Sequence, residues 1–90
     1  MMAKYPGLRG KVVLITGASS GIGAATAAYF AGEGCSLSLL GRNLSALEDT
    51  RDECVLRGVL KDKILIVTAD LQSERECREA VRKTLDYFGG

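Results

Sequence analysis

The sequence predicts an α/β fold: a doubly wound parallel sheet of which this chain supplies the amino-terminal β-α-β-α-β-α half. Three short strand-like runs, the first and third rich in β-branched residues, alternate with longer segments of helical periodicity. This alternation, with short connections, is typical of parallel strands joined by right-handed helical crossovers. A chain of 90 residues is one small domain at most, so we expect residues 1–90 to form part of a single domain.

The first strand and the first helix are expected on either side of a glycine-rich segment. Residues 11–15 form a short β-branched run that stops at Thr16 and Gly17, as a strand buried on both faces does. A helix is expected from Gly21, and Gly34 is well placed to end it. The apolar side of this helix is expected to comprise Ile22, Ala25, Thr26, Tyr29 and Phe30.

The second strand is expected at residues 36–40, followed by a helix that Gly58 ends. Ser45 and Glu48 have the spacing of a capping box, in which a serine caps the helix and a glutamate three residues later bonds back to it. The apolar side of this helix is expected to comprise Leu44, Leu47, Cys54 and Val55.

The third strand is expected at residues 63–69, an apolar run with Asp70 at its carboxyl end. Ser73 and Glu76 form a second capping box before the last helix. This helix keeps the spacing of an amphipathic segment, with an apolar side of Cys77, Ala80, Val81, Thr84, Leu85 and Phe88.

Composition and charge exclude several classes of function. The formal net charge of +1 gives no electrostatic basis for binding nucleic acid or an anionic membrane. The three cysteines are far apart and the chain has no histidine, so we expect reduced thiols and no metal site. Neither a secretory signal nor a run of the roughly 20 apolar residues that a membrane helix needs is present, so a cytoplasmic protein is expected.

The glycine-rich segment predicts a dinucleotide site of the Rossmann type. It lies between a strand and a helix, where a parallel sheet presents a helix amino terminus to phosphate groups. Gly17 permits the sharp turn, Gly21 lets the backbone approach a pyrophosphate, and Gly23 allows close packing of helix on strand. A purely structural turn is the alternative. The phosphate loop of nucleoside triphosphatases does not fit, because no lysine follows the glycines at the required spacing.

Two charged residues at strand ends complete the expected site. Arg42 follows the second strand, where a site for NAD would place an acidic residue, and its guanidinium can pair with the 2′-phosphate of NADP(H). Asp70 can accept a hydrogen bond from the amine of adenine. The alternatives are a solvated arginine and a carboxylate that serves only the turn into the last helix.

Residues 16–23 match the motif Thr-Gly-x-x-x-Gly-x-Gly, and on this motif the chain resembles the amino-terminal part of the short-chain dehydrogenase/reductase family, classical type. Ala69-Asp70-Leu71 is similar to the family's adenine-contacting step. The resemblance implies a preference for NADP(H) over NAD(H) that depends on Arg42, because Ser20 stands where NADP-preferring members often carry a basic residue. It implies that the cofactor is bound by Gly17, Ser19, Ser20, Gly21, Ile22, Gly23, Arg42, Asn43, Asp70 and Leu71.

The resemblance does not extend to catalysis. The family's catalytic serine and its Tyr-x-x-x-Lys pair are absent, and Arg9 and Glu33 stand four residues after Tyr5 and Tyr29. We therefore expect no catalytic residue in this chain, and expect it to be inactive alone. In the complete protein the resemblance implies hydride transfer between nicotinamide and a small carbonyl or alcohol substrate, and a homo-oligomer. The alternatives are a short non-catalytic module that binds NADP(H) or a sheet edge, and a truncated product without a stable fold.

Overall fold

The computed structural model describes residues 8–19 and 21–89 and contains a sheet of three parallel strands in the order β1-β2-β3. The strands are β1 (Val12–Thr16), β2 (Ser36–Gly41) and β3 (Ile64–Thr68). The helices are α1 (Gly21–Gly32), α2 (Leu44–Leu56) and α3 (Glu74–Phe88), with a 3-10 turn, η2 (Lys61–Lys63), before β3. The predicted β-α-β-α-β-α half of a doubly wound sheet is confirmed.

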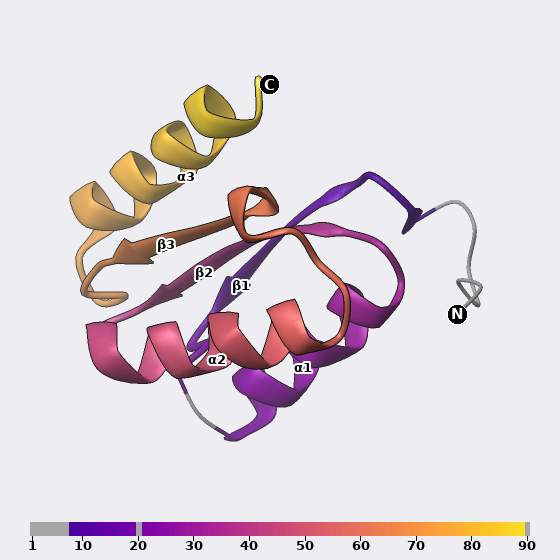
Figure 1. Ribbon diagram of the computed structural model, residues 1–90. Coiled ribbons are helices and arrows are strands. Elements are labelled where there is room, and N and C mark those ends of the chain that lie inside the picture. The colour runs from indigo at the N-terminus through magenta and orange to yellow at the C-terminus, as the bar shows by residue number, and fades with distance from the viewer. Residues whose placement is uncertain (1–7, 20, 90) are drawn as a thin grey trace.

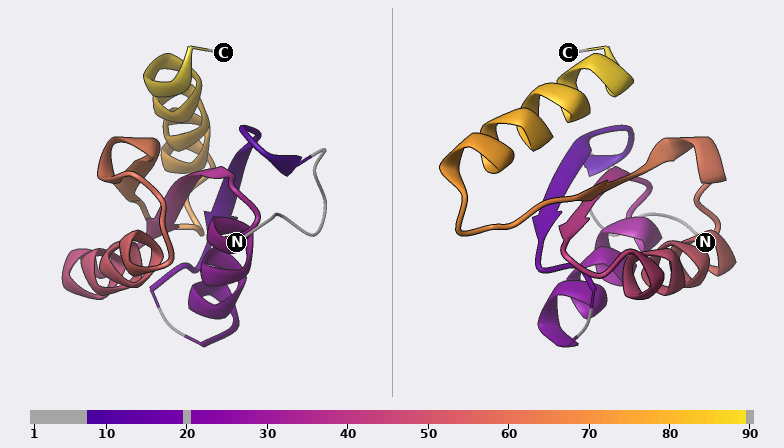
Figure 2. Two further views of the ribbon diagram at one scale, coloured as in Figure 1. Left: turned by 45° about the vertical axis from the view of Figure 1, so that its right-hand side comes forward. Right: turned by 90° about the vertical axis from the view of Figure 1, so that its left-hand side faces the viewer.

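The helices cover both faces of the sheet (Figure 1). The helices α1 and α2 lie side by side on one face, and α3 lies alone on the other (Figure 2). Because β2 is the central strand and is covered on both sides, five of its six residues are buried. The strand nevertheless carries polar residues, and the buried Ser38 has its hydroxyl 2.7 Å from that of Thr84 on α3.

Most of the core lies between β2 and the pair of helices α1 and α2. The side chains of Leu37, Leu39 and Leu47 are fully buried there. On the opposite face, Leu40 and Val67 pack with Ala80 of α3 in a smaller cluster. The face that carries α3 is thus more sparsely packed than the face that carries α1 and α2.

The packed side of α1 differs from the predicted one. Ala27 and Ala31 are buried, whereas Ile22 is 86% exposed and Tyr29 is 49% exposed. Alanines occur on several sides of this helix, so apolar spacing did not distinguish them. The side with the smallest residues packs on the sheet because it permits the closest approach of helix and strand. Of the predicted residues, Phe30 packs against the core.

The start of α2 also differs from the prediction. The amino-terminal cap is Asn43, whose Oδ1 accepts a hydrogen bond from the Ala46 backbone N–H at 3.1 Å, so the predicted capping box of Ser45 and Glu48 is wrong. A cap residue must lie in an extended conformation, and Asn43 is the one that follows the end of β2 closely. On the side that packs, Leu47 and Cys54 are buried as predicted, while Leu44 and Val55 are exposed.

Ser73 caps the last helix as predicted, but the second bond of the predicted capping box, from the Ser73 N–H to Glu76, is not formed. Ser73 Oγ accepts a hydrogen bond from the Glu76 backbone N–H at 3.2 Å, and Gly89 ends α3 in the left-handed conformation. Ala80 and Thr84 are buried, and the Thr84 hydroxyl lies 2.7 Å from that of Ser38 on β2. Two further residues of the predicted apolar side, Val81 and Leu85, are about half exposed at 46% and 51%.

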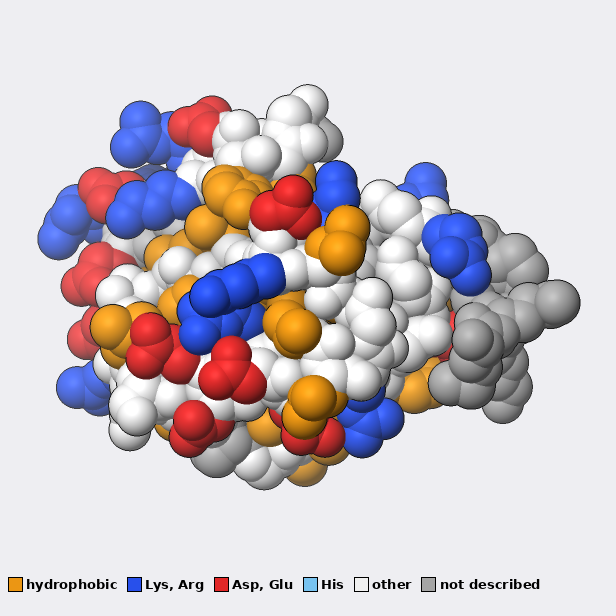
Figure 3. All heavy atoms as spheres, viewed as in Figure 1, with side chains coloured by type: hydrophobic (Ala, Val, Ile, Leu, Met, Phe, Trp, Pro, Cys, Tyr) orange, Lys and Arg blue, Asp and Glu red, His pale blue; other side chains and the backbone are white. Residues whose placement is uncertain are grey.

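Most charged side chains of α2 and α3 lie on the outer faces of these helices. Figure 3 shows acidic and basic side chains mixed over α3 and acidic ones gathered over α2. On α3, Arg75 pairs with Glu79 and Arg78 with Glu74 at exposed positions one turn apart. Such pairs contribute about 0.3–0.5 kcal/mol each. Within residues 8–19 and 21–89, no helix is long and apolar enough to cross a membrane.

The three cysteines are free thiols in different surroundings. Burial raises the pKa of Cys35, and the charge of Glu33 raises it further. Burial also raises the pKa of Cys54, and Arg57 opposes that shift in part. Cys77 is only half-buried in the first turn of α3, where its Sγ donates to the carbonyl oxygen of Leu71 at 3.5 Å.

We expect Cys77 to react with a disulfide reagent such as DTNB at pH 8 well before the other two cysteines. The thiolate is the nucleophile, and the raised pKa values of Cys35 and Cys54 reduce its population in addition to the barrier of burial. The measurement is the time course of thiol release from the native chain, with the urea-unfolded chain as control. Equal rates for all three thiols in the native chain would contradict the expectation.

Candidate dinucleotide-binding site

The carboxyl ends of the three strands meet at one edge of the sheet (Figure 1). Thr16 at the end of β1 pairs with Leu40, and Gly41 at the end of β2 pairs with Thr68. The glycine-rich turn, Arg42 and Asp70 each follow one of these strand ends. The structure thus places segments far apart in the sequence along the edge where doubly wound proteins bind their ligands.

The glycines of the turn have the conformations that the sequence predicts for Gly17 and Gly23. Gly17 has a φ of +65°, a backbone conformation that residues other than glycine rarely adopt. At Gly23 a Cβ atom would collide with the carbonyl oxygen of Gly17, so only glycine allows this approach of α1 to the turn. Gly21 has a φ of +59° and no heavy atom within 4 Å of its Cβ position, so the space beside it is open.

A buried threonine of α2 holds the turn in place. Thr50 Oγ1 donates a hydrogen bond to the carbonyl oxygen of Ala18 at 2.8 Å. The backbone N–H of Ala18 donates to the Leu40 carbonyl oxygen at 3.0 Å, which ties the same residue to the end of β2. Thr50 could not be identified from local sequence, because its partner lies 32 positions earlier and no local pattern connects the two residues.

Replacing Thr50 with valine is expected to lower the free energy of unfolding by about 1–2 kcal/mol, because the buried Ala18 carbonyl loses its side-chain partner. The matched control is Thr26→Val. Thr26 Oγ1 donates to the Ile22 carbonyl oxygen at 2.7 Å within α1, at an exposed site where water can replace it. Urea unfolding followed by circular dichroism measures both changes, and equal losses would contradict the role given to Thr50.

Arg42 is exposed at the end of β2, and no hydrogen bond or ion pair of its side chain occurs among the described residues. Gly41 precedes it, and a Cβ atom there would lie 3.3 Å from Leu47 and 3.6 Å from the hydroxyl of Ser19. The close packing at Gly41 brings the glycine-rich turn next to the start of α2. The guanidinium of Arg42 is therefore free to bind an anion at this edge.

For three further residues that the resemblance assigns to the cofactor, the structure limits which of their groups a ligand could contact. The side-chain oxygen of Asn43 caps α2, so only its amide group could still donate to a phosphate. The side chain of Ile22 points into solvent at the start of α1, which leaves its backbone N–H as the group available to a ligand. Leu71 is partly exposed beside Asp70. Ser20 lies outside the described residues.

Asp70 lies in a shallow hollow of about 250 Å³ lined by Arg42, Thr68, Ala69, Asp70 and Glu76. One carboxylate oxygen of Asp70, Oδ1, accepts a hydrogen bond from the Gln72 backbone N–H at 2.9 Å, as the alternative of a turn carboxylate predicts. A carboxylate has acceptor capacity beyond this one bond, so Asp70 can serve both the turn and a ligand. Glu76 in the same hollow was predicted only as part of a capping box.

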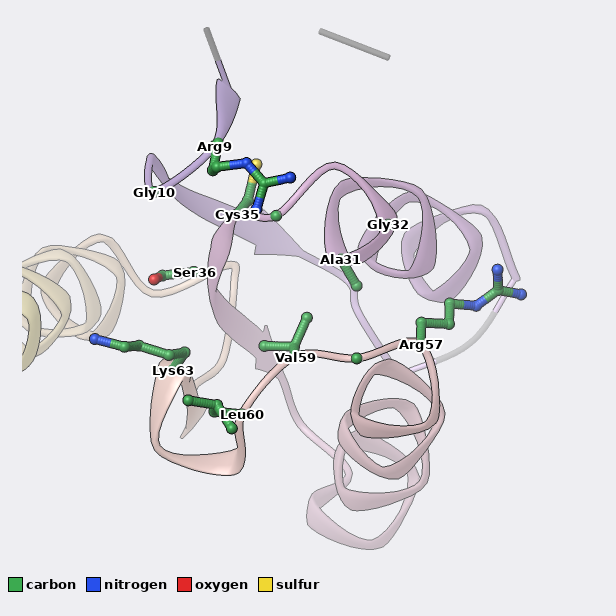
Figure 4. Close-up of a pocket in the computed structure, with 12 residues that line it drawn as sticks. Arg9, Gly10, Ala31, Gly32, Cys35, Ser36, Arg57, Val59, Leu60 and Lys63 are labelled. Atoms are coloured by element: carbon green, nitrogen blue, oxygen red, sulfur yellow. The ribbon is translucent and has the colours of Figure 1, made fainter. Parts of the chain in front are cut away.

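A second hollow, of about 460 Å³, lies at the opposite, amino-terminal end of the strands (Figure 4). Figure 4 shows the side chains of Arg57 and Lys63 extending in opposite directions. Arg9, the third basic residue of this hollow, lies apart from both, so the charges do not converge on one point as an anion site would require. Among the described residues, the polar groups suited to a dinucleotide are those at the carboxyl ends of the strands.

The fold is that of an α/β protein whose parallel strands end at one edge of the sheet, beside a glycine-rich turn and the start of a helix. The sequence model described as short chain dehydrogenase matches residues 11–90, and the chain belongs to this family. It therefore represents the cofactor-binding region of an oxidoreductase family, as the sequence analysis expected.

Known proteins agree with this assignment. An uncharacterized oxidoreductase of Bacillus subtilis, YhdF, is 41% identical over 83 residues, which cover 91% of this chain and 28% of that protein. The structure of glucose dehydrogenase of Caenorhabditis elegans superposes with a TM-score of 0.86 at 39% identity, covering 91% of this chain and 35% of the other. The structure of 3-ketoacyl-(acyl-carrier-protein) reductase from Brucella melitensis, complexed with NADH, superposes with a TM-score of 0.78 at 36% identity. The match covers 91% of this chain and 31% of the other. The chain thus spans about a third or less of these proteins.

Proposed function

We propose that this chain binds the adenosine-phosphate end of a nicotinamide dinucleotide, with NADP(H) preferred over NAD(H). The observation that carries the proposal is that the glycine-rich turn, the hollow around Asp70 and Arg42, which has no side-chain partner among the described residues, lie along one edge of the sheet. Relatives bind nicotinamide cofactors, and one structure of a relative contains NADH. The preference for NADP(H) depends on Arg42.

Each part of the edge suits one part of the dinucleotide. The backbone N–H groups at the start of α1 suit the pyrophosphate, since the first turn of a helix has unpaired donors and a favourable dipole. The open space beside Gly21 allows a phosphate to come close to the backbone. Arg42 suits the 2′-phosphate because a guanidinium can donate two parallel hydrogen bonds to it. Asp70 suits the exocyclic amine of adenine.

We place the reaction of the complete protein in the class of carbonyl reduction or alcohol oxidation, with a small carbonyl or alcohol as substrate. The bound nicotinamide would supply hydride chemistry. These 90 residues contain no Tyr-x-x-x-Lys pair, so the proton donor of that reaction would lie in another part of a longer protein. The residues of this chain bind and orient the cofactor and take no part in proton transfer.

The test is direct titration of the purified chain with NADPH and with NADH by isothermal calorimetry. We expect binding of both dinucleotides in competition with adenosine 2′,5′-bisphosphate, with the tighter binding for NADPH. Absence of binding by a chain whose far-ultraviolet circular dichroism and urea unfolding show it to be folded would overturn the proposal. Equal affinities would overturn the part that concerns NADP(H).

A second candidate function is pairing through the edge of the sheet. Among the described residues β1 pairs only with β2, and its other edge carries unpaired backbone groups. Beside this edge lies a groove of about 470 Å³ lined by Lys11, Val12, Leu14, Val81 and Leu85, among others. Exposed edges with apolar neighbours favour pairing with another chain. Analytical ultracentrifugation over a wide concentration range tests this, and a monomer at all concentrations would remove it.

A further inference from the structure

The carboxylate of Glu76 lies between the start of α3 and the hollow at the end of β3. Glu76 Oε1 accepts a hydrogen bond from the Asp70 backbone N–H at 3.0 Å. In the capping box that the sequence predicts, this carboxylate would instead bond back to the cap residue, Ser73. The Ser73 N–H is used otherwise, because it donates to the Asp70 carbonyl oxygen at 2.9 Å.

These bonds fix the conformation of Asp70 from several sides. Its backbone N–H is held by Glu76, its carbonyl oxygen by Ser73 and its Oδ1 by the N–H of Gln72 at 2.9 Å. The adjacent Ala69 N–H donates to the Gly41 carbonyl oxygen at 2.9 Å, which ties the segment to the residue before Arg42. Glu76 is therefore the side chain through which α3 holds the turn that presents Asp70.

The same carboxylate contributes to the charge of the hollow. Arg42 is the single basic residue among its lining residues, and Asp70 and Glu76 are the two acidic ones. No ion pair joins Arg42 to either carboxylate in the part of the chain that the structure describes. The formal charge of the lining is therefore −1. A 2′-phosphate, which itself is an anion, is attracted by Arg42 and repelled by Glu76, whereas an unsubstituted ribose is insensitive to both.

We propose that Glu76 is a positioning and specificity-determining residue of this site: its hydrogen bond orients the turn at Asp70, and its charge limits the preference for a 2′-phosphate. The proposal rests on the proposed function, since it concerns the same nucleotide site. The two effects are separable. The hydrogen bond supports binding of any adenine nucleotide, while the charge changes only the ratio between nucleotides with and without a 2′-phosphate.

The test compares adenosine 2′,5′-bisphosphate with adenosine 5′-monophosphate, which differ only in the 2′-phosphate. Glu76→Gln retains a carbonyl acceptor for the Asp70 N–H and removes the charge. We expect it to raise the affinity ratio of bisphosphate to monophosphate by about three- to tenfold at low salt, and less at 1 M salt. The matched control is Glu74→Gln, which removes the same charge from the first turn of α3 at a side chain 85% exposed and paired with Arg78. The control should change the ratio less than about twofold.

A second variant tests the positioning role. Glu76→Ala removes both the hydrogen bond and the charge, so it is expected to weaken the monophosphate by about fivefold or more and to raise the affinity ratio as Glu76→Gln does; Glu76→Gln should restore the affinity for the monophosphate. If both nucleotides bind and Glu76→Gln changes the ratio no more than Glu74→Gln does, the inference is overturned and the proposed function stands. If the folded unmodified chain binds neither nucleotide, the proposed function itself fails. Should Glu76→Ala not fold, the ratio measured with Glu76→Gln decides alone.

Discussion

Replacing Gly21 with valine is expected to weaken the binding of both NADPH and NADH by about a hundredfold or more. Gly21 has a φ of +59°, and a Cβ atom added there would have no heavy atom within 4 Å. A valine side chain would occupy the space through which the pyrophosphate approaches the start of α1. Loss of one or two charge-assisted hydrogen bonds from backbone N–H groups to phosphate accounts for a factor of about a hundred. The measurement is calorimetric titration with each dinucleotide.

The control for this variant is Gly10→Val. Gly10 has a φ of +80° and also an open Cβ position, but it lies before β1, at the opposite end of the strand. Both substitutions impose a β-branched residue on a left-handed backbone, so both are expected to reduce stability by similar amounts. Only the Gly21 variant should lose the nucleotide. Retained affinity in a folded Gly21→Val chain would contradict the position given to the pyrophosphate.

Replacing Arg42 with alanine is expected to weaken NADPH by about 10- to 100-fold and NADH by less than about threefold. The guanidinium is exposed and without a partner among the described residues, so its removal costs little stability and leaves the fold intact. A pair of charge-assisted hydrogen bonds to the 2′-phosphate accounts for the expected loss. Titration with both dinucleotides at two salt concentrations measures the effect.

Two comparison variants sharpen the result for Arg42. Arg42→Lys keeps the charge but not the planar pair of donors, and an intermediate loss of NADPH affinity is expected. Arg82→Ala removes an exposed arginine from α3, away from the strand ends, and should leave the ratio of NADPH to NADH affinity unchanged. Equal losses of NADPH and NADH in Arg42→Ala would show that the 2′-phosphate is not the partner of this residue.

The order of elements and the glycine-rich turn could be predicted because each depends on short stretches of sequence. Short runs rich in Val and Ile predict β1 and β3, and the φ of +65° at Gly17 follows from the turn in which it lies. The packed side of α1 could not be predicted in this way. Apolar residues occur on every side of that helix, and steric fit selected Ala27 and Ala31 over the larger Ile22 and Tyr29.

The parts of the site that sequence reasoning missed depend on tertiary contacts. Two residues suited to capping, Asn43 and Ser45, precede the bulk of α2, and the end of β2 decides that Asn43 is used. Thr50 reaches a turn 32 positions earlier, and Glu76 bonds to Asp70 rather than to the cap residue. The spacing of Ser73 and Glu76 signalled a cap, but only the position of β3 beside α3 brings the carboxylate to the hollow.

The most direct test of the central claim is a titration of the ¹⁵N-labelled chain with adenosine 2′,5′-bisphosphate, followed by the chemical shifts of its backbone amides. We predict that the amides which shift most are those of Gly17, Gly21, Ile22, Arg42 and Leu71, at the carboxyl ends of the three strands. Saturable shifts confined to Gly34, Gly58 and Val59, in the hollow at the other end of the sheet, would contradict the claim. The absence of any saturable shift in a folded chain would contradict it equally.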